Sequence, residues 1–316
     1  MPELRRIPVN GVELNVAVSG SGPAVLLLLH GFPHTWELWT DVIAGLSDRY
    51  RVIAPDLRGF GASGHAESGY DAGTLAEDAA ALLTALDVSS AAVVGIDAGT
   101  PPAFLLALRR PGLVRRLVVM ESLLGGLPGA EEFLAGGPPW WFGFHSAAPG
   151  LAETVLEGHE AEYVDWFLRT GTLGDGVRPA VRDAFVRAYT GREALSRAFS
   201  YYRALPESAA QIDEAVTAAR LTVPTMALGS HPVGAALERQ LRPVTDDLTA
   251  HLIEGCGHII PLHRPDALLA LLRPFLAGAT LPHFRRHMAE ERAESPHDRG
   301  GRPTPTRSPE GSGSRR

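Results

Sequence analysis

The sequence lacks lysine altogether, and each of its 29 basic residues is an arginine. This absence excludes two kinds of chemistry, because Schiff-base catalysis needs a lysine amine and a Walker-type phosphate-binding loop needs its lysine. Cysteine is almost as scarce, since Cys256 stands alone and cannot form a disulfide within the chain. The sequence therefore predicts neither an amine-based catalyst nor a fold that depends on disulfides.

Long apolar runs and an excess of basic charge are also missing. The longest apolar runs, such as Ala24–Leu29, are far shorter than the roughly 20 residues of a membrane-spanning helix. The N-terminal residues MPELRR show no apolar signal core. We therefore expect a cytoplasmic protein that does not enter a membrane.

The basic residues that are present do not form a nucleic-acid binding face. The formal net charge is −7, from 29 basic and 36 acidic residues. Residues 281–316 carry eight arginines and five acidic residues, so residues 1–280 have 21 basic and 31 acidic residues, or −10. Because phosphate binding needs a basic face, we expect no nucleic-acid partner. The sequence does not determine the oligomeric state, and a homodimer is compatible with it.

What the sequence does contain is an alternation of strands and helices. Continuous apolar runs at 24–29, 51–54, 91–95 and 117–120 predict strands that are buried on both faces. Helical patterns cover 75–86 and 102–110, and further strands are expected at 12–18, 222–228 and 251–253, with a last helix at about 267–272. Strands that alternate with helices predict an α/β fold with a mostly parallel central sheet flanked by helices.

This alternation stops after Glu121. Residues 122–216 are rich in aromatic residues, glycine and proline, with helical patterning and no sign of a buried strand. We interpret them as a helical cap inserted into a core that comprises residues 1–121 and 217–282. Residues 283–316 are polar and rich in arginine, proline, serine and glycine, which is typical of a disordered tail.

An acidic residue on a sharp turn is the strongest sign of chemistry. The segment VVGIDAGT places Asp97 between a predicted strand and a helix, in the pattern Gly-x-Asp-x-Gly. Small flanking residues are typical of a nucleophile elbow, whose central side chain projects above the sheet. Because the usual serine is absent, an esterase or lipase would lack its nucleophile, whereas a carboxylate attacks saturated carbon and becomes an ester. Taken alone, the pattern is also consistent with a helix cap at Asp97.

Two more residues complete a candidate catalytic set. His258 follows the last predicted strand in the motif GCGH, where this architecture has its base. The loop after the strand at 222–228 has no carboxylate, so the acid that orients the histidine is predicted to be Glu121, at the end of the strand after the elbow. The simpler alternatives are a structural histidine and a solvated strand end. We expect no metal site, and we expect surface loops for the histidines that lack ligand spacing, His34, His65, His231 and His263.

With these residues the chain resembles the epoxide hydrolases and haloalkane dehalogenases of the α/β-hydrolase superfamily, over about residues 5–280. It looks most like the Cif-like subgroup of bacterial epoxide hydrolases, in which the acid follows the strand after the elbow. The matching motifs are HGFP at 30–33, DLRGFG at 56–61, GID at 95–97, ME at 120–121, LAET at 151–154, YYRAL at 201–205 and GCGH at 255–258. The resemblance implies an α/β-hydrolase fold and a hydrolase that acts through an aspartyl ester without a cofactor.

The resemblance also implies roles for residues around the triad. The backbone N–H groups of Phe32 and Ala98 would form the oxyanion hole. Tyr202 would donate a hydrogen bond to the epoxide oxygen, with Tyr201 beside it in the substrate pocket. The alternative for Tyr202 is a buried tyrosine that is bonded to the backbone.

The sequence departs from the subgroup in the cap. Where the subgroup has a histidine after a tryptophan as a second donor, this chain has Trp141 after Trp140. His145 follows four residues later and shares a helix face with Trp141 if this segment is helical. We expect Trp140, Trp141 and His145 to line the substrate pocket.

Three functions are consistent with these features. The leading one is an epoxide hydrolase that converts a small apolar epoxide into a vicinal diol. A haloalkane dehalogenase is the first alternative, because Trp140 and Trp141 could bind a halide. However, the tryptophan and asparagine that such enzymes usually have beside the nucleophile are Ala98 and Phe32 here, and no arginine follows Asp97 to bind a carboxylate as in fluoroacetate-type enzymes. The third function is a catalytically silent binding protein that has kept the fold, motivated by Trp141.

Overall fold

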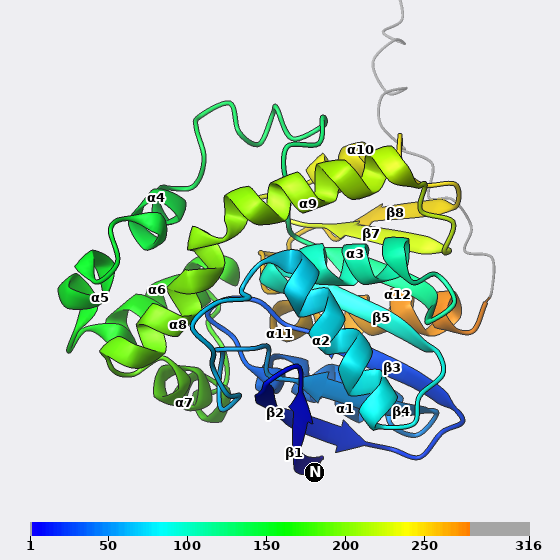
Figure 1. The fold of residues 1–316 in the computed structure, drawn as a ribbon, viewed down its shortest axis with the longest axis horizontal. Coiled ribbons are helices and arrows are strands. Elements are labelled where there is room, and N and C mark those ends of the chain that lie inside the picture. Colours follow the sequence, from blue (N-terminus) through cyan, green and yellow to red (C-terminus); the bar gives the residue numbers. More distant parts are fainter. Residues whose placement is uncertain (1, 279–316) are drawn as a thin grey trace, which may run out of the picture. The chain divides into compact units, whose positions relative to one another are not determined.

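An eight-stranded sheet forms the centre of the protein. The computed structural model describes residues 2–278, and the predicted tail at 283–316 lies outside them. The strands are β1 (Glu3–Val9), β2 (Val12–Ser19), β3 (Ala24–Leu29), β4 (Tyr50–Pro55), β5 (Ala91–Ile96), β6 (Val114–Met120), β7 (Thr225–Gly229) and β8 (Leu248–Leu252). Their order in the sheet is β1-β2-β4-β3-β5-β6-β7-β8 (Figure 1). β2 pairs antiparallel with both β1 and β4, and all pairs from β4 to β8 are parallel.

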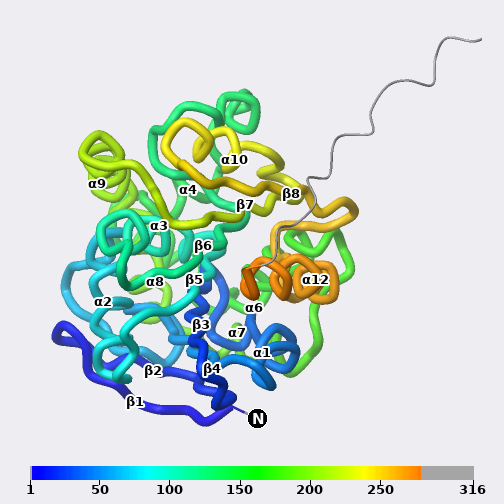
Figure 2. The backbone as a smooth tube through the Cα atoms, turned by 90° about the vertical axis from the view of Figure 1, so that its right-hand side faces the viewer, coloured from blue at the N-terminus to red at the C-terminus, as the bar shows by residue number. Residues whose placement is uncertain are grey.

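Helices cover both faces of this sheet. They are α1 (Thr40–Leu46), α2 (Ala72–Ala85), α3 (Thr100–Arg109), α10 (Ala236–Leu241), α11 (Ile260–His263) and α12 (Pro265–Leu276). Figure 2 shows α2 and α3 on one side of the sheet, and α1 and α12 on the other. This arrangement explains why every residue of β5 is buried and why the strand has a continuous apolar sequence.

Six further helices come between β6 and β7. They are α4 (Trp140–Ser146), α5 (Leu151–Leu156), α6 (Glu160–Gly171), α7 (Pro179–Ala188), α8 (Arg192–Arg203) and α9 (Leu205–Ala218). Figure 1 shows α4 to α8 grouped together beyond one end of the sheet. We call residues 122–216 the cap, the name and bounds given to this segment in the sequence analysis. None of the helices within residues 2–278 has the length and apolar character needed to cross a bilayer.

The predicted α/β-hydrolase fold is confirmed, and most strand bounds agree with the prediction to within a few residues. The main differences are β1 (Glu3–Val9), for which no strand was predicted, and β8, which was expected at 251–253 and lies at Leu248–Leu252. Four of its five residues are half-buried and the last is exposed, so the strand has no continuous apolar run to mark its start.

Candidate active site

Asp97 lies at the tip of the turn that joins β5 to α3. Its backbone has φ = 52°, in the left-handed region that non-glycine residues seldom adopt. The turn is possible because its neighbours are glycines: a Cβ on Gly95 would overlap the carbonyl oxygen of Gly99, and one on Gly99 would overlap that of Leu29. The small residues that the sequence places around Asp97 are therefore a steric requirement of the elbow.

The Asp97 carboxylate is held on both oxygens. Oδ1 accepts the backbone N–H of Phe32 at 2.8 Å, and Oδ2 lies 3.3 Å from Nε2 of His258. Burial raises the pKa of Asp97, but the bond and charge of His258 and the N–H groups of Phe32 and Ala98 outweigh this, so the pKa is lowered. The two residues predicted to form an oxyanion hole thus both direct an N–H toward the candidate nucleophile.

His258 bridges the two acidic residues. Its Nδ1 lies 3.1 Å from Oε2 of Glu121, which is fully buried and whose Oε1 accepts the backbone N–H of Ser230 at 2.5 Å. Burial lowers the pKa of His258, but the carboxylates of Asp97 and Glu121 raise it more, and the net result is a rise from 6.5 to about 10. The structure therefore brings together all three residues of the candidate triad, with the imidazole charged in the resting state.

Two members of this set remain open to a ligand. The side chains of Asp97 and His258 are 26% and 23% exposed, whereas Glu121 has no exposed surface. An acid that is fully enclosed can orient a base but cannot meet a substrate. Asp97 and His258 can therefore contact a ligand, whereas Glu121 can act only through His258.

The Phe32 side chain joins the triad to the cap. Its ring makes edge contacts with His145 of α4, Phe167 of α6, Tyr189 and Tyr202, at centroid distances of 5.1 to 5.8 Å. Aromatic rings packed edge to face form a rigid apolar wall. The cap and the core therefore share one aromatic wall beside Asp97.

Tyr201 and Tyr202 lie on α8 with their rings 5.5 Å apart. Both are buried, and burial together with the charge of Asp97 raises the pKa of each well above the ordinary tyrosine value. Neither hydroxyl has a hydrogen-bond partner among the described residues. Both hydroxyls therefore stay protonated and free to donate, with Asp97 close enough to influence them.

The three predicted pocket residues of α4 are placed differently from one another. His145 is fully buried, stacks on Phe199 at 4.1 Å and contacts the Tyr202 ring at 4.3 Å. Its Nε2 bonds to the Tyr163 hydroxyl at 2.6 Å, and burial lowers its pKa to about 3. Trp141 is half-buried and reaches the wall through Phe167 at 5.5 Å. Trp140 is 55% exposed and packs on Trp141 and Trp166, so it lies farther out.

Two histidines expected on the surface are buried, and the prediction for them is wrong. His34 is 1% exposed under the Phe185 ring, and burial lowers its pKa to about 3. His263 is 7% exposed and bonds through both ring nitrogens. His65 and His231 are exposed, as expected. Both errors have one cause, because the residues that cover His34 and His263 come from the cap, far away in the sequence.

Sequence reasoning also missed residues that support the histidine loop. The backbone N–H of Ser230 donates a hydrogen bond to Glu121, and its hydroxyl donates one to the Gly257 carbonyl at 2.9 Å. Cys256 is 1% exposed, and burial raises the pKa of its thiol to about 11. The only available signal was that Ser230 follows β7 directly, at the same edge of the sheet as Glu121.

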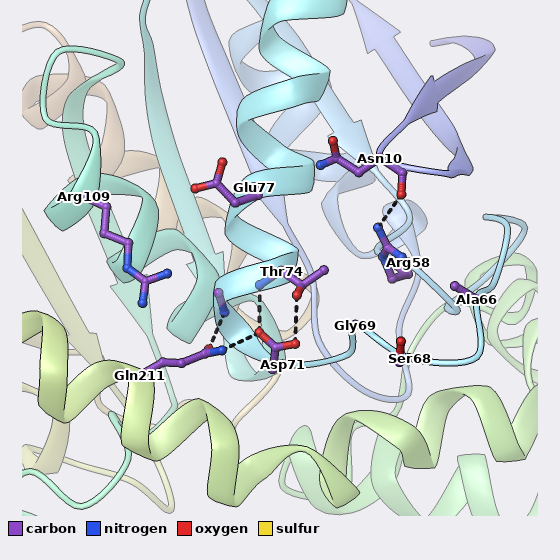
Figure 3. Close-up of a pocket in the computed structure, with 11 residues that line it drawn as sticks. Asn10, Arg58, Ala66, Ser68, Gly69, Asp71, Thr74, Glu77, Arg109 and Gln211 are labelled. Carbon is purple, nitrogen blue, oxygen red and sulfur yellow. Dashed lines mark hydrogen bonds between the residues drawn. The ribbon is translucent and has the colours of Figure 1, made fainter.

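A separate polar cavity of about 690 Å³ lies at the N-terminal end of α2, beside α9. Figure 3 shows that Asp71 accepts hydrogen bonds from Thr74 and from Gln211 of α9. None of the described residues that line it belongs to the candidate triad. Because Asp71 and Gly73 of this end of α2 bond to Gln211 of α9, we interpret the cavity as part of the packing between α2 and α9. Within residues 2–278 no three His, Cys, Asp or Glu side chains are placed to hold a metal ion.

Comparisons with known proteins identify the fold family and several relatives. A family model for the alpha/beta hydrolase fold matches residues 24–264. The soluble epoxide hydrolase of Corynebacterium sp. (strain C12) is 30% identical over 283 residues, covering 85% of this chain and 95% of that protein. The fluoroacetate dehalogenase of Burkholderia sp. is 26% identical over 289 residues, covering 88% and 94%. A crystal structure of an aCif variant has a TM-score of 0.79 at 25% identity, covering 87% of this chain and 88% of that one.

Proposed function

Because the chain belongs to the alpha/beta hydrolase fold family and is a hydrolase, we propose that it opens an epoxide through an ester on Asp97 and releases a vicinal diol. The observation that carries this proposal is a carboxylate, not a hydroxyl, on the nucleophile elbow, 3.3 Å from an imidazole. The resemblance to epoxide hydrolases inferred from the motifs is confirmed by the relatives.

In the first step Oδ2 of Asp97 bonds to an epoxide carbon, and the carbon–oxygen bond of the ring breaks. Oδ1 becomes the ester carbonyl oxygen and keeps the N–H of Phe32, which it already accepts at 2.8 Å. The released electron pair goes to the epoxide oxygen, which takes a proton from the Tyr202 hydroxyl. The Tyr202 phenolate regains its proton from solvent, and the imidazolium of His258 releases its proton to solvent, because its counter-charge disappears when Asp97 becomes an ester.

In the second step neutral His258, oriented by Glu121, takes a proton from water while the water oxygen attacks Cγ of Asp97. The N–H groups of Phe32 and Ala98 stabilise the oxyanion on Oδ1. The ester bond then breaks, and the diol leaves with the second water proton. Asp97 keeps the oxygen of the water, and His258 is again an imidazolium.

The surroundings of Asp97 support an uncharged, apolar substrate. The positive charge that lowers its pKa is that of His258. The wall beside it consists of aromatic rings. The negative charge of Asp97 would repel a substrate with its own carboxylate.

A second candidate is hydrolysis of a carbon–halogen bond. The relationship to a fluoroacetate dehalogenase favours it, and Trp141 provides an indole N–H with no partner among the described residues. The free hydroxyls of Tyr201 and Tyr202 argue against it, because they can donate a proton to the oxygen of an opening epoxide, whereas a leaving halide needs no proton. A silent binding protein would not need an imidazole held between Asp97 and Glu121 at 3.3 and 3.1 Å.

A single-turnover reaction in ¹⁸O-labelled water tests the ester route. The expected result is label in the peptide that contains Asp97 and none in the first equivalent of diol. Label in the diol alone would show direct attack by water and would contradict the proposal. A panel of aryl and aliphatic epoxides beside haloalkanes, scored for diol and free halide, separates the two candidate reactions.

A further inference from the structure

The peptide that precedes His258 is held on both sides. The N–H of Gly257 donates to Nδ1 of His263 at 2.8 Å, and its carbonyl accepts the Ser230 hydroxyl at 2.9 Å. The N–H of the same Ser230 donates to Glu121, which orients the His258 ring. The direction in which His258 faces therefore depends on His263 and Ser230 as well as on Glu121.

The bond from Gly257 determines which nitrogen of His263 carries a proton. A backbone N–H can only donate, so Nδ1 must be unprotonated and the proton of the neutral ring is on Nε2. Nε2 lies 3.0 Å from Oδ2 of Asp175, which accepts a hydrogen bond from this N–H. The ring is buried, whereas the Asp175 side chain is 63% exposed. Asp175 thus fixes the tautomer that lets His263 hold the histidine loop.

Asp175 belongs to the cap, in the loop between α6 and α7. The same segment meets the histidine loop at two further points. The N–H of Ile259 donates to the carbonyl of Gly171 at 2.9 Å. A Cβ on Gly257 would overlap that carbonyl oxygen, so the two backbones approach as closely as glycine allows. The end of α6 is therefore hydrogen-bonded to Ile259 and packed against Gly257, the residues on both sides of His258.

We propose that His263 and Asp175 are positioning residues that couple the cap to His258 in the hydrolysis of the ester. The inference rests on the proposed function, because it divides the reaction into two steps with different demands. Attack by Asp97 needs the carboxylate, which the elbow holds, and a proton from Tyr202, but it does not need His258 as a base. Activation of water needs the His258 ring to be oriented toward the ester. This orientation depends on the position of Gly257, which His263 holds and Asp175 supports.

Three variants test the coupling. His263→Phe keeps a ring but removes the acceptor for Gly257, whereas His263→Asn keeps an acceptor near the position of Nδ1 but is too short to reach Asp175. Asp175→Ala removes the cap partner at an exposed position. A matched control is Asp183→Ala, another exposed cap aspartate, which is paired with Arg182 and lies on α7.

Two measurements are made on each variant. Quenched-flow mass spectrometry gives the rates of ester formation and ester decay, with an epoxide that the wild type turns over. NMR of the His258 imidazole reports its environment without substrate. For His263→Phe we expect ester decay to slow about 10- to 100-fold while formation changes less than about threefold, with a shifted His258 signal. The rate of ester decay in His263→Asn should be close to that of the wild type. The rate in Asp175→Ala should lie between those of His263→Phe and the wild type, and the rate in Asp183→Ala should equal that of the wild type.

Equal slowing of both steps, or an unchanged His258 signal with unchanged decay, would overturn the coupling. If His263→Phe does not fold, Asp175→Ala decides the question, because its site is exposed. If the wild type forms no ester with any epoxide, the proposed function fails. The NMR comparison still decides in that case whether His263 sets the orientation of His258.

Discussion

At the scale of single residues, the charge on Asp97 controls what His258 can do. The raised pKa of His258, about 10, means that the imidazole is protonated at neutral pH and cannot accept a proton from water. Once Asp97 is an ester, the hydrogen bond and the charge of its carboxylate no longer raise that pKa. The base therefore becomes active only after the nucleophile has reacted, which orders the two steps without any movement of the chain.

This order predicts different behaviour for two variants. His258→Gln should still form the ester but not hydrolyse it, so intact-protein mass spectrometry should find the enzyme plus one substrate mass. Asp97→Asn should show no mass shift, and its turnover should fall by a factor of about 10⁴ or more. An adduct on Asp97→Asn, or rapid turnover by His258→Gln, would place the nucleophile elsewhere.

The two free tyrosine hydroxyls predict a second contrast. Tyr202→Phe should lower kcat for an epoxide by at least about 100-fold, because the alkoxide loses its proton donor. The loss should be smaller for substrates whose leaving group needs no proton, such as an alkyl halide. Tyr201→Phe is the matched control, with a neighbouring buried ring on the same helix. If Tyr201→Phe has the larger effect, the donor is Tyr201 and the assignment is reversed.

How far these residues could be predicted depends on the range of their contacts. Asp97, Glu121 and His258 follow β5, β6 and β8 of the same sheet, so the order of strands and turns was enough to bring them together. The burial of His34 and His263 depends on cap residues such as Phe185 and Asp175, more than 85 positions away. Local pattern carries no signal for such contacts, and both histidines were misplaced.

At the scale of secondary structure, the elbow between β5 and α3 is the element on which the site depends. Its geometry was predictable because it is set by the local spacing of Gly95, Asp97 and Gly99. The start of β8 was not predictable, because half-buried residues leave no periodic apolar pattern. The packing of α4 on α8, which brings His145 against Tyr202, is likewise a tertiary result.

The elbow predicts a loss of stability on a minimal change. Gly99→Ala would press a methyl group into the carbonyl oxygens of Leu29 and His30, so the unfolding free energy should fall by about 1–3 kcal/mol or more. Gly112→Ala is the control, because nothing lies within 4 Å of its added methyl group. Urea unfolding measures both. Equal stability of the two variants would mean that the turn is not tightly packed.

At the scale of the whole molecule, the ion pair between Asp97 and His258 links stability to pH. The folded-state pKa of His258 is raised from 6.5 to about 10, so its contribution is fully present below pH 6.5 and is lost as pH rises through about 10. The pKa of Asp97 is lowered from 3.8, so the same interaction is present above pH 3.8 and is lost as pH falls through the folded value.

This linkage predicts how the wild type and a variant diverge. Between pH 6.5 and about 10 the unfolding free energy of the wild type should decline more steeply than that of His258→Gln, which has no imidazole to titrate. Denaturant titrations at several pH values in this window measure both slopes. Parallel curves would mean that the pair contributes nothing to folding.

The enclosed sulfur of Cys256 has a practical consequence. It is the sole thiol of the chain, it lies two positions before His258, and a high pKa keeps it in the unreactive protonated form. A maleimide dye can therefore reach the thiol only when the segment around Cys256 opens locally. Because the chain has no lysine to compete for the dye, the rate of labelling measures the rate of this local opening.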